Sequence, residues 1–172
     1  MSAKFCLTAV ASLMAASASA AASGPTDPQI AHIAYTAGNI DIEAAKLALE
    51  KSKTKAVRDF ASEMVRDHEA VNDKALALVK KLHVTPEQNT TSIELIKQAA
   101  ATKAKLAKLH GQAFDRAYAV NEVAYHKTVN GALKTTLIPS ASNGELKSLL
   151  ETGLTLFSEH QKHAEHLSAS FK

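Results

Sequence analysis

The feature that most constrains the fold is a series of residues between Thr54 and Leu82, all apolar except His68, that are alternately four and three positions apart. The run consists of Val57, Ala61, Met64, His68, Val71, Ala75, Leu78 and Leu82. In an α-helix this spacing places every member on one stripe, which has to be buried against other elements. Prolines occur only at positions 25, 28, 86 and 139, so none interrupts the run. The segment is therefore predicted to be a long amphipathic helix in a bundle.

The same spacing predicts three more long helices. The first begins at the capping sequence 26–29 and ends near Lys51, the third extends from about Phe114 to 131–133, and the fourth begins at the capping sequence 142–145 and runs to the C-terminus. Their stripes are Ile30, Ile33, Ala37, Ile40, Ala44 and Leu47; Phe114, Ala117, Asn121, Ala124 and Thr128; and Leu146, Leu150, Gly153, Phe157, His160, Ala164, Leu167 and Phe171. Sustained three-four spacing is typical of helices packed in a bundle.

The connection between the second and third long helices is long enough to contain a helix of its own. A polar loop with Pro86 leads to the capping sequence 91–94, and a Lys-rich helix then runs to about Leu109 and ends at Gly111. A connection of this length can span the bundle, which would make the second and third helices parallel. Two hairpins joined by one crossover form the ferritin-like four-helix bundle, an all-α fold. A plain up-down bundle with a helical decoration is the alternative.

Residues 1–20 have the layout of a secretory signal peptide. Lys4 precedes an uncharged apolar run, and Ala18-Ser19-Ala20 is a small-x-small cleavage sequence. The run is too short to cross a bilayer about 30 Å thick, and the rest of the chain has no apolar stretch of spanning length. We therefore expect removal of 1–20, a short linker at 21–26 and one bundle domain at 27–172, in a periplasmic or secreted protein without a transmembrane segment. An N-terminal helix of the mature fold is the alternative.

Composition makes several classes of function unfavourable. The single cysteine, Cys6, lies in the signal segment, so the mature protein is expected to have no disulfide and no thiol chemistry. Twenty basic against 17 acidic residues give a net charge of +3, which is small for a nucleic-acid-binding protein. The sequence contains no Gly-rich phosphate loop and no nucleophile motif, which argues against an enzyme.

Four lysines of the connecting helix, Lys97, Lys103, Lys105 and Lys108, offer a basic face. Such a face suits weak association with anionic lipid or polysaccharide of the cell envelope. Most Lys-rich faces are simply solvated, and this interpretation also stays open.

Polar residues on the buried stripes are the main indication of function, because an unpaired polar group in a core is costly. His68 and His160 lie on the stripes of the second and fourth helices, and Asp41 lies on an inward face of the first. In the third helix, Asp115, Glu122 and His126 share one face with Ala119. A cluster of imidazoles and carboxylates is therefore expected inside the bundle.

Imidazole and carboxylate groups are ligands for transition metals, so this cluster is a candidate site for iron, zinc or copper. Carboxylate-bridged di-iron bundles carry Glu-x-x-His motifs, and no acidic residue of this chain has a histidine three positions later. Spacing of four is found instead at Glu122–His126 and at Glu159–His163. The hypothetical metal site comprises Asp41, His68, Asp115, Glu122, His126, His160 and His163.

Two alternatives stay open for these residues. Asp41, His68, Asp115, Tyr118 and His160 would also satisfy one another in a purely architectural hydrogen-bond network. Counting residues from the first interhelical turn offsets Asp41 from His68 by roughly 7 Å, which predicts that they do not reach the same ion. His160, His163 and His166, three residues apart, either chelate a metal weakly or form a solvated helix end.

Several segments together resemble a known protein family. They are 38–49 (Gly-Asn-Ile-Asp-Ile-Glu-Ala-Ala-Lys-Leu-Ala-Leu), 57–68 (ending in Met-Val-Arg-Asp-His), 114–118 (Phe-Asp-Arg-Ala-Tyr) with His126, and the region of His160. The chain resembles an exported bacterial domain-of-unknown-function family with a ferritin-like bundle, often labelled putative outer membrane protein. The resemblance covers nearly all of the mature chain. It implies a ferritin-like, mainly periplasmic protein and supplies no reaction; the first acidic position, usually Glu in that family, is Asp41 here.

Overall fold

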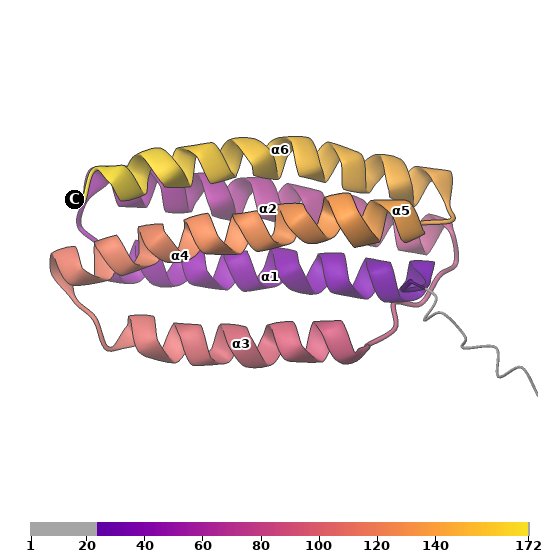
Figure 1. Ribbon diagram of the computed structural model, residues 1–172, viewed down its shortest axis with the longest axis horizontal. Helices are drawn as coiled ribbons and strands as arrows, with labels where there is room; N and C mark the ends of the chain where they lie inside the picture. Colours follow the sequence, from indigo (N-terminus) through magenta and orange to yellow (C-terminus); the bar gives the residue numbers. More distant parts are fainter. Residues whose placement is uncertain (1–23, 172) are drawn as a thin grey trace, which may run out of the picture.

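The computed structural model describes residues 24–171, which form a bundle of long helices (Figure 1). The helices are α1 (Asp27–Lys51), α2 (Lys55–Lys81), α3 (Thr90–Ala107), α4 (Gly111–Ala132), the short α5 (Ile138–Ser140) and α6 (Gly144–Ala169), with a π-helical turn at Leu133–Leu137 between α4 and α5. The predicted signal segment lies outside the described residues. Within residues 24–171, no helix combines the length and apolarity that crossing a bilayer requires.

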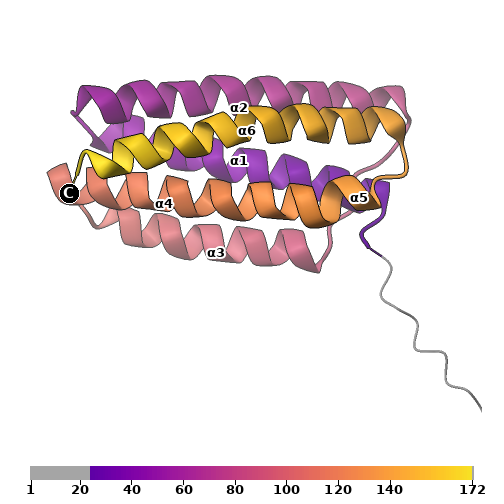
Figure 2. The ribbon, with the colours of Figure 1, turned by 45° about the horizontal axis from the view of Figure 1, so that its top comes forward.

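The connectivity is the predicted ferritin-like one. α1 and α2 form one antiparallel hairpin and α4 and α6 form the other, while α3 runs back along the outside of the bundle, against α1 (Figures 1 and 2). Because the connection that contains α3 runs from one end of the bundle to the other, α2 and α4 run in the same direction (Figure 1). The crossover interpretation is confirmed, and the plain up-down alternative is wrong.

Two helix starts use different capping residues from those predicted. At α3 the cap is Asn89, whose side chain accepts a hydrogen bond from the Ser92 backbone N–H, and the predicted Thr91 lies inside the helix. At α6 the cap is Asn143, which accepts hydrogen bonds from Glu145 N–H and Leu146 N–H. Asparagine is among the strongest N-cap residues, so each helix begins where an Asn side chain satisfies its first N–H groups.

One helix boundary also differs from the prediction, and another agrees with it. Gly111 does not end the connecting helix: it begins α4 with a φ of 55°, a value that glycine adopts readily. α4 ends at Ala132, within the predicted range 131–133, and a π-turn follows it directly, with Ile138 N–H donating to the carbonyl of Leu133 five residues back. This wider turn directly precedes Pro139, which has no N–H to donate, and it keeps Leu133 and Leu137 buried.

The buried stripes match the prediction on two helices and are rotated on the others. α6 buries its predicted stripe from Leu146 to Leu167, and α2 does so from Val57 to His68. On α4, Ala124 and Thr128 are exposed, and the buried face is instead the polar one with Glu122 and His126. On α1, the half-buried residues Ile40, Ala44 and Leu47 face a groove shared with α3 and α4.

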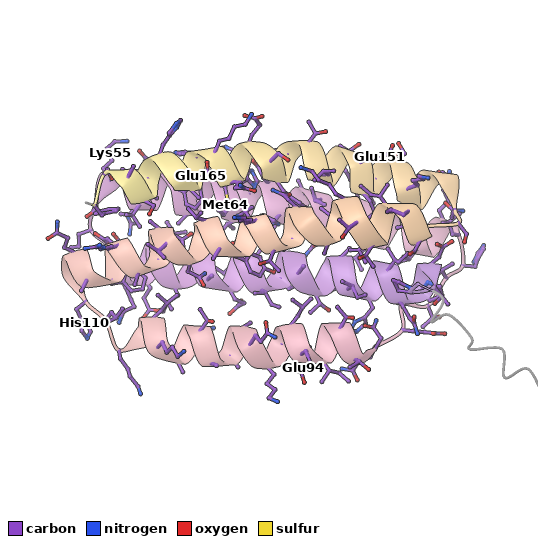
Figure 3. The ribbon with its side chains drawn as sticks, in the orientation of Figure 1. Lys55, Met64, Glu94, His110, Glu151 and Glu165 are labelled. Carbon is purple, nitrogen blue, oxygen red and sulfur yellow. The ribbon has the colours of Figure 1, made fainter. Side chains whose placement is uncertain are left out.

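The apolar core is divided into two parts along the bundle. One part contains Phe60, Met64, Phe114, Tyr118 and neighbours near the α1–α2 turn, and the other contains Ile30, Ile33, Leu133, Leu150 and neighbours at the opposite end. In Figure 3, Met64 lies between the helices, whereas Lys55 and Glu151 lie at the outer surface. Asp41, His68, Glu122, His126 and His160 lie in sequence between these two parts on their helices, whereas Asp115 lies within the first part, between Phe114 and Tyr118.

Candidate metal centre

The candidate centre is built from all four helices of the two hairpins. α1 provides Asp41, α2 provides His68, α4 provides Glu122 and His126, and α6 provides His160. All five side chains are buried, with at most 3% of each residue exposed. We call these five residues the inner cluster. Of the residues predicted for the metal site, these five are the ones that the structure brings together.

Three imidazoles converge in the inner cluster. The ring centroids of His68 and His126 are 5.8 Å apart, those of His68 and His160 are 5.4 Å apart, and those of His126 and His160 are 5.5 Å apart. One ring nitrogen from each histidine lies within 4.8 Å of a nitrogen of the other two. A single ion between them would meet three nitrogen donors after small side-chain movements, since metal–nitrogen bonds are about 2 Å long.

Asp41 touches two of these rings, so the inference that Asp41 and His68 lie too far apart to reach the same ion is wrong. Its Oδ2 lies 2.6 Å from His68 Nε2 and 3.4 Å from His126 Nε2. Helical side chains lean toward the N-terminus of their helix, so in an antiparallel pair Asp41 leans away from the α1–α2 turn and His68 leans toward it. The side chains of Asp41 and His68 therefore lean toward each other and meet, although their backbones are offset along the bundle. Burial alone would raise the pKa of Asp41, but the adjacent His68 and His126 rings lower it below its usual range.

Backbone packing supports this contact one turn away. Gly38 on α1 faces Asn72 on α2, and a Cβ at Gly38 would overlap the Asn72 side chain. The absence of a side chain lets α1 and α2 approach closely at this level. Asn72 Nδ2 donates a hydrogen bond to Asn39 Oδ1 at 3.0 Å, which joins the two helices beside the inner cluster.

Two of the histidines are oriented from outside the cluster. His126 Nδ1 donates to the backbone carbonyl of Glu122 at 3.0 Å, and His160 Nε2 donates to Asp67 Oδ2 at 3.0 Å. A carbonyl or carboxylate oxygen accepts, so in each ring the other nitrogen carries the free lone pair. Those nitrogens, His126 Nε2 and His160 Nδ1, are buried without a hydrogen-bond partner. This is the arrangement that metal-ligating histidines have in proteins.

The third ring is held by an aromatic contact. His68 stacks on Phe157, with ring centroids 4.5 Å apart and an angle of 8° between the planes. Phe157 was predicted only as an apolar residue of its stripe, and this role has no signal in the sequence. The role of Asp67, which positions His160, does have a signal in the sequence, because Asp67 directly precedes His68 on α2.

The inner cluster concentrates unpartnered polar atoms. Within the described chain, buried side-chain atoms without a hydrogen bond include His68 Nδ1, His126 Nε2 and His160 Nδ1, whereas Asp41 Oδ2 and His68 Nε2 lie 2.6 Å from each other. A buried polar atom without a partner typically costs about 1–3 kcal/mol. The architectural network predicted as the alternative is formed in part, through the 2.6 Å contact between Asp41 and His68. A bound cation would satisfy the ring nitrogens of His126 and His160 that the observed contacts leave without a partner.

Glu122 is the second carboxylate of the inner cluster. One of its oxygens lies with atoms of Asp41 and His126 in a second group whose members are all within 4.8 Å of one another. Burial raises the pKa of Glu122 well above its usual range, and the negative charge of Asp41 raises it further. Burial and the charge of Asp41 therefore both favour the protonated form of this carboxyl group.

The structure does not bring Asp115 and His163 into the inner cluster. Asp115 precedes Glu122 by two helical turns, about 10 Å along α4, and accepts a hydrogen bond from Thr54 Oγ1 at 2.5 Å. The His163 side chain is 46% exposed and contacts Glu63 on the bundle surface. Tyr118 is buried with an unpartnered hydroxyl and lies in the apolar core. Sequence spacing placed these residues on the correct helices but not at the level of the cluster.

Comparisons with known proteins agree with this fold. Residues 12–167 match the family described as Domain of unknown function (DUF4142). The chain belongs to this family. Among solved structures, the chain is similar to CopM in its Cu(II)-bound form, with a TM-score of 0.66 and 14% sequence identity over 87% of this chain and 99% of the CopM chain. A comparison with curated proteins finds no match.

The DUF4142 bundle also contains a pocket that reaches the inner cluster. Its volume is about 760 Å³, and it extends from Pro25 and Asn89, at the end of the bundle where α1 begins, to His68 and His126. The walls between are mostly apolar and include Ile33, Val71, Val129, Leu133 and Leu150. The pocket gives the two histidines a route to the end of the bundle.

The buried groups of this DUF4142 protein predict a maximum in the pH dependence of stability. Burial lowers the pKa of His126 and of His160 below 6.5, whereas burial and Asp41 raise that of Glu122 well above 4.5. Below pH 6.5 the unfolded chain binds two protons on these histidines and the folded chain holds one on Glu122, so stability falls as pH drops. Where the histidines of the unfolded chain are neutral and Glu122 holds its proton only in the folded chain, stability falls as pH rises.

The measurement is urea unfolding of metal-free protein from about pH 5 to about pH 8. The Glu122→Gln variant mimics the protonated side chain, so its stability is expected to level off above pH 6.5 while the acid side keeps its slope. An alkaline decrease that is the same in both proteins would contradict the assignment to Glu122.

Proposed function

We propose that this protein binds one transition-metal ion tightly inside its helical bundle, with Cu²⁺ as the foremost ligand. His68, His126 and His160 would provide nitrogen donors, and Asp41 would provide a carboxylate oxygen. The observation that carries the proposal is the convergence of three buried imidazoles from three helices, two of which have their outer nitrogen bonded and their inner nitrogen unpartnered.

The donor set favours copper over the other candidates. Imidazole suits Cu, Zn, Ni and Fe, and among divalent first-row ions a given site of this type generally binds Cu²⁺ most strongly. The di-iron arrangement would need Glu-x-x-His motifs, which this sequence lacks. The similarity in fold to CopM in its Cu(II)-bound form supports copper as the first metal to test.

The chain's own residues have distinct parts in binding. Asp67 and the Glu122 carbonyl hold two rings in the tautomer that offers a lone pair to the interior. Asp41 contributes the negative charge that a divalent cation needs in a buried site, since its lowered pKa keeps it ionised. Glu122 supplies a second carboxylate on loss of its proton, so uptake of a metal there would release a proton.

We also propose that the protein acts after export, in the periplasm or as a secreted protein. The support is the signal-peptide layout of residues 1–20. Weak association with the envelope through α3 belongs to the same proposal. Lys103 already pairs with Glu43 of α1 at 2.9 Å, which leaves a smaller basic face than the sequence suggested.

The decisive experiment is metal analysis of protein purified without a histidine tag, followed by titration with Cu²⁺, Zn²⁺ and Fe²⁺. We expect one tightly bound Cu²⁺ per chain, lost in the His68→Ala, His160→Ala double variant. The matched control is the His110→Ala, His166→Ala variant, which removes two exposed histidines and is expected to keep the ion. Wild-type protein that takes up no metal, combined with a large fall in melting temperature in the first variant, would support the architectural alternative.

A further inference from the structure

The pocket that reaches the inner cluster is an elongated space between the helices of the two hairpins. On α1 its lining residues run from Gln29 to Gly38, a distance of about 14 Å at the rise of an α-helix. Its volume of about 760 Å³ equals that of about 25 water molecules, so a chain of about a dozen carbon atoms fits inside. Pockets that bind small molecules typically have volumes of about 300–1,000 Å³.

Small side chains on all four helices create this space. They are Ala34, Ala37 and Gly38 on α1, Ala75 on α2, Ala132 on α4 and Gly153 on α6. Protein interiors are normally close-packed, with larger side chains filling the space between neighbouring helices. Because alanine and glycine leave that space open at several successive levels, the pocket is a property of this sequence rather than of one side-chain position.

The wall of the pocket is uncharged. Among the described residues that line it there is no Lys, Arg, Asp or Glu. Val129, Leu133 and Leu150 are typical of the wall, whereas the mouth has neutral polar side chains such as Asn89 and Thr90. A charged group inside would lose its hydration without gaining a counter-ion. The wall therefore suits an uncharged molecule that is mostly hydrocarbon.

The inner end of the pocket has a polar atom that the protein does not satisfy. His68 and His126 line this end. His68 Nε2 lies 2.6 Å from Asp41 Oδ2, and the ionised carboxylate favours the ring proton on Nε2. The other nitrogen, His68 Nδ1, then carries a lone pair, and it is buried without a hydrogen-bond partner. A hydroxyl group on a ligand would donate to this nitrogen.

We propose that the pocket binds one uncharged aliphatic alcohol of about a dozen carbon atoms, with its hydroxyl group at the inner end. The hydrocarbon chain packs against the apolar wall, and the hydroxyl donates a hydrogen bond to His68 Nδ1. The proposal goes beyond metal binding and concerns the metal-free protein, in which no ion occupies the lone pair of His68.

Displacement of the neutral fluorescent probe N-phenylnaphthylamine from the full, metal-free protein tests this proposal. Dodecanol is expected to displace the probe. Its methyl ether, which cannot donate a hydrogen bond, is expected to bind at least about fivefold more weakly, the effect of losing one hydrogen bond. Dodecanoate, which is charged at about pH 8, is expected to bind at least about tenfold more weakly than dodecanol, because the wall offers no counter-ion.

A pair of variants places the alcohol in the pocket. Ala34→Leu, Ala75→Leu fills part of the space from α1 and α2 and is expected to weaken dodecanol binding at least about tenfold. Ala77→Leu, Ala101→Leu makes the same chemical change at exposed positions outside the pocket and is expected to bind dodecanol as the wild-type protein does. Circular dichroism of each variant verifies that it is folded.

Three results would overturn the alcohol site. They are wild-type protein that does not bind dodecanol, dodecanol binding that is unchanged in Ala34→Leu, Ala75→Leu, and a methyl ether that binds as tightly as the alcohol. The last two comparisons separate the pocket and the hydroxyl contact from unspecific binding to apolar surface. Since every measurement uses metal-free protein, none of these results bears on the titration with Cu²⁺, and the proposed function would remain standing.

Discussion

Saturation with Cu²⁺ is expected to raise the melting temperature of this protein by about 8–16 °C. A ligand that binds only the folded state at 1,000 times its dissociation constant stabilises that state by about 4.1 kcal/mol. For a chain of this size, each kcal/mol shifts the melting temperature by about 2–4 °C. The inner cluster exists only when four helices are packed together, so the unfolded chain has no equivalent site. Differential scanning calorimetry with a Cu²⁺ buffer gives the measurement.

Variants of the inner cluster determine where this stabilisation originates. In Asp41→Asn, His68→Ala the shift is expected to disappear, because one carboxylate and one imidazole are lost from the same contact. His32→Asn, Asp73→Asn removes the same two group types away from the cluster and serves as the control. An equal shift in the first variant would mean that the copper responsible binds elsewhere.

Phe60→Ala is expected to destabilise the protein by about 3–5 kcal/mol, the cost typical of removing a large aromatic ring from a core. Phe60 is fully buried, and its ring centroid lies 6.1 Å from that of Tyr118 in an edge-on contact. The neighbouring helices close only part of the cavity that remains. Urea unfolding measures the loss, which corresponds to a fall of about 6–20 °C in melting temperature.

The control for this substitution is Val120→Ala on α4, where 51% of the side chain is exposed. Its expected effect is within about 0.5 kcal/mol. Phe60→Ala should retain the tightly bound Cu²⁺ at temperatures where it is folded, because Phe60 belongs to the apolar core beside the inner cluster. A loss below about 1 kcal/mol would contradict the packing described for this part of the core.

The difference between prediction and structure is clearest on α4. Its apolar stripe was placed through Ala124 and Thr128, and the helix instead buries Glu122 and His126. Sequence periodicity ranks faces by hydrophobicity, and a face that carries a polar site looks like a solvent face by that criterion. The correct face was nevertheless recognisable from the common spacing of Asp115, Ala119, Glu122 and His126.

Residue spacing determined by itself the four long helices, their stripes on α2 and α6, and the crossover, because an α-helix has a fixed period and an apolar stripe has to be buried. Residue spacing also selected the residues of the inner cluster, together with Asp115 and His163, which lie elsewhere. Only the tertiary structure decided which of them meet. Side-chain lean in antiparallel helices joins Asp41 to His68, and the alignment of α4 with its neighbours places His126, not Asp115, at the level of that contact. Spacing within one helix specifies neither.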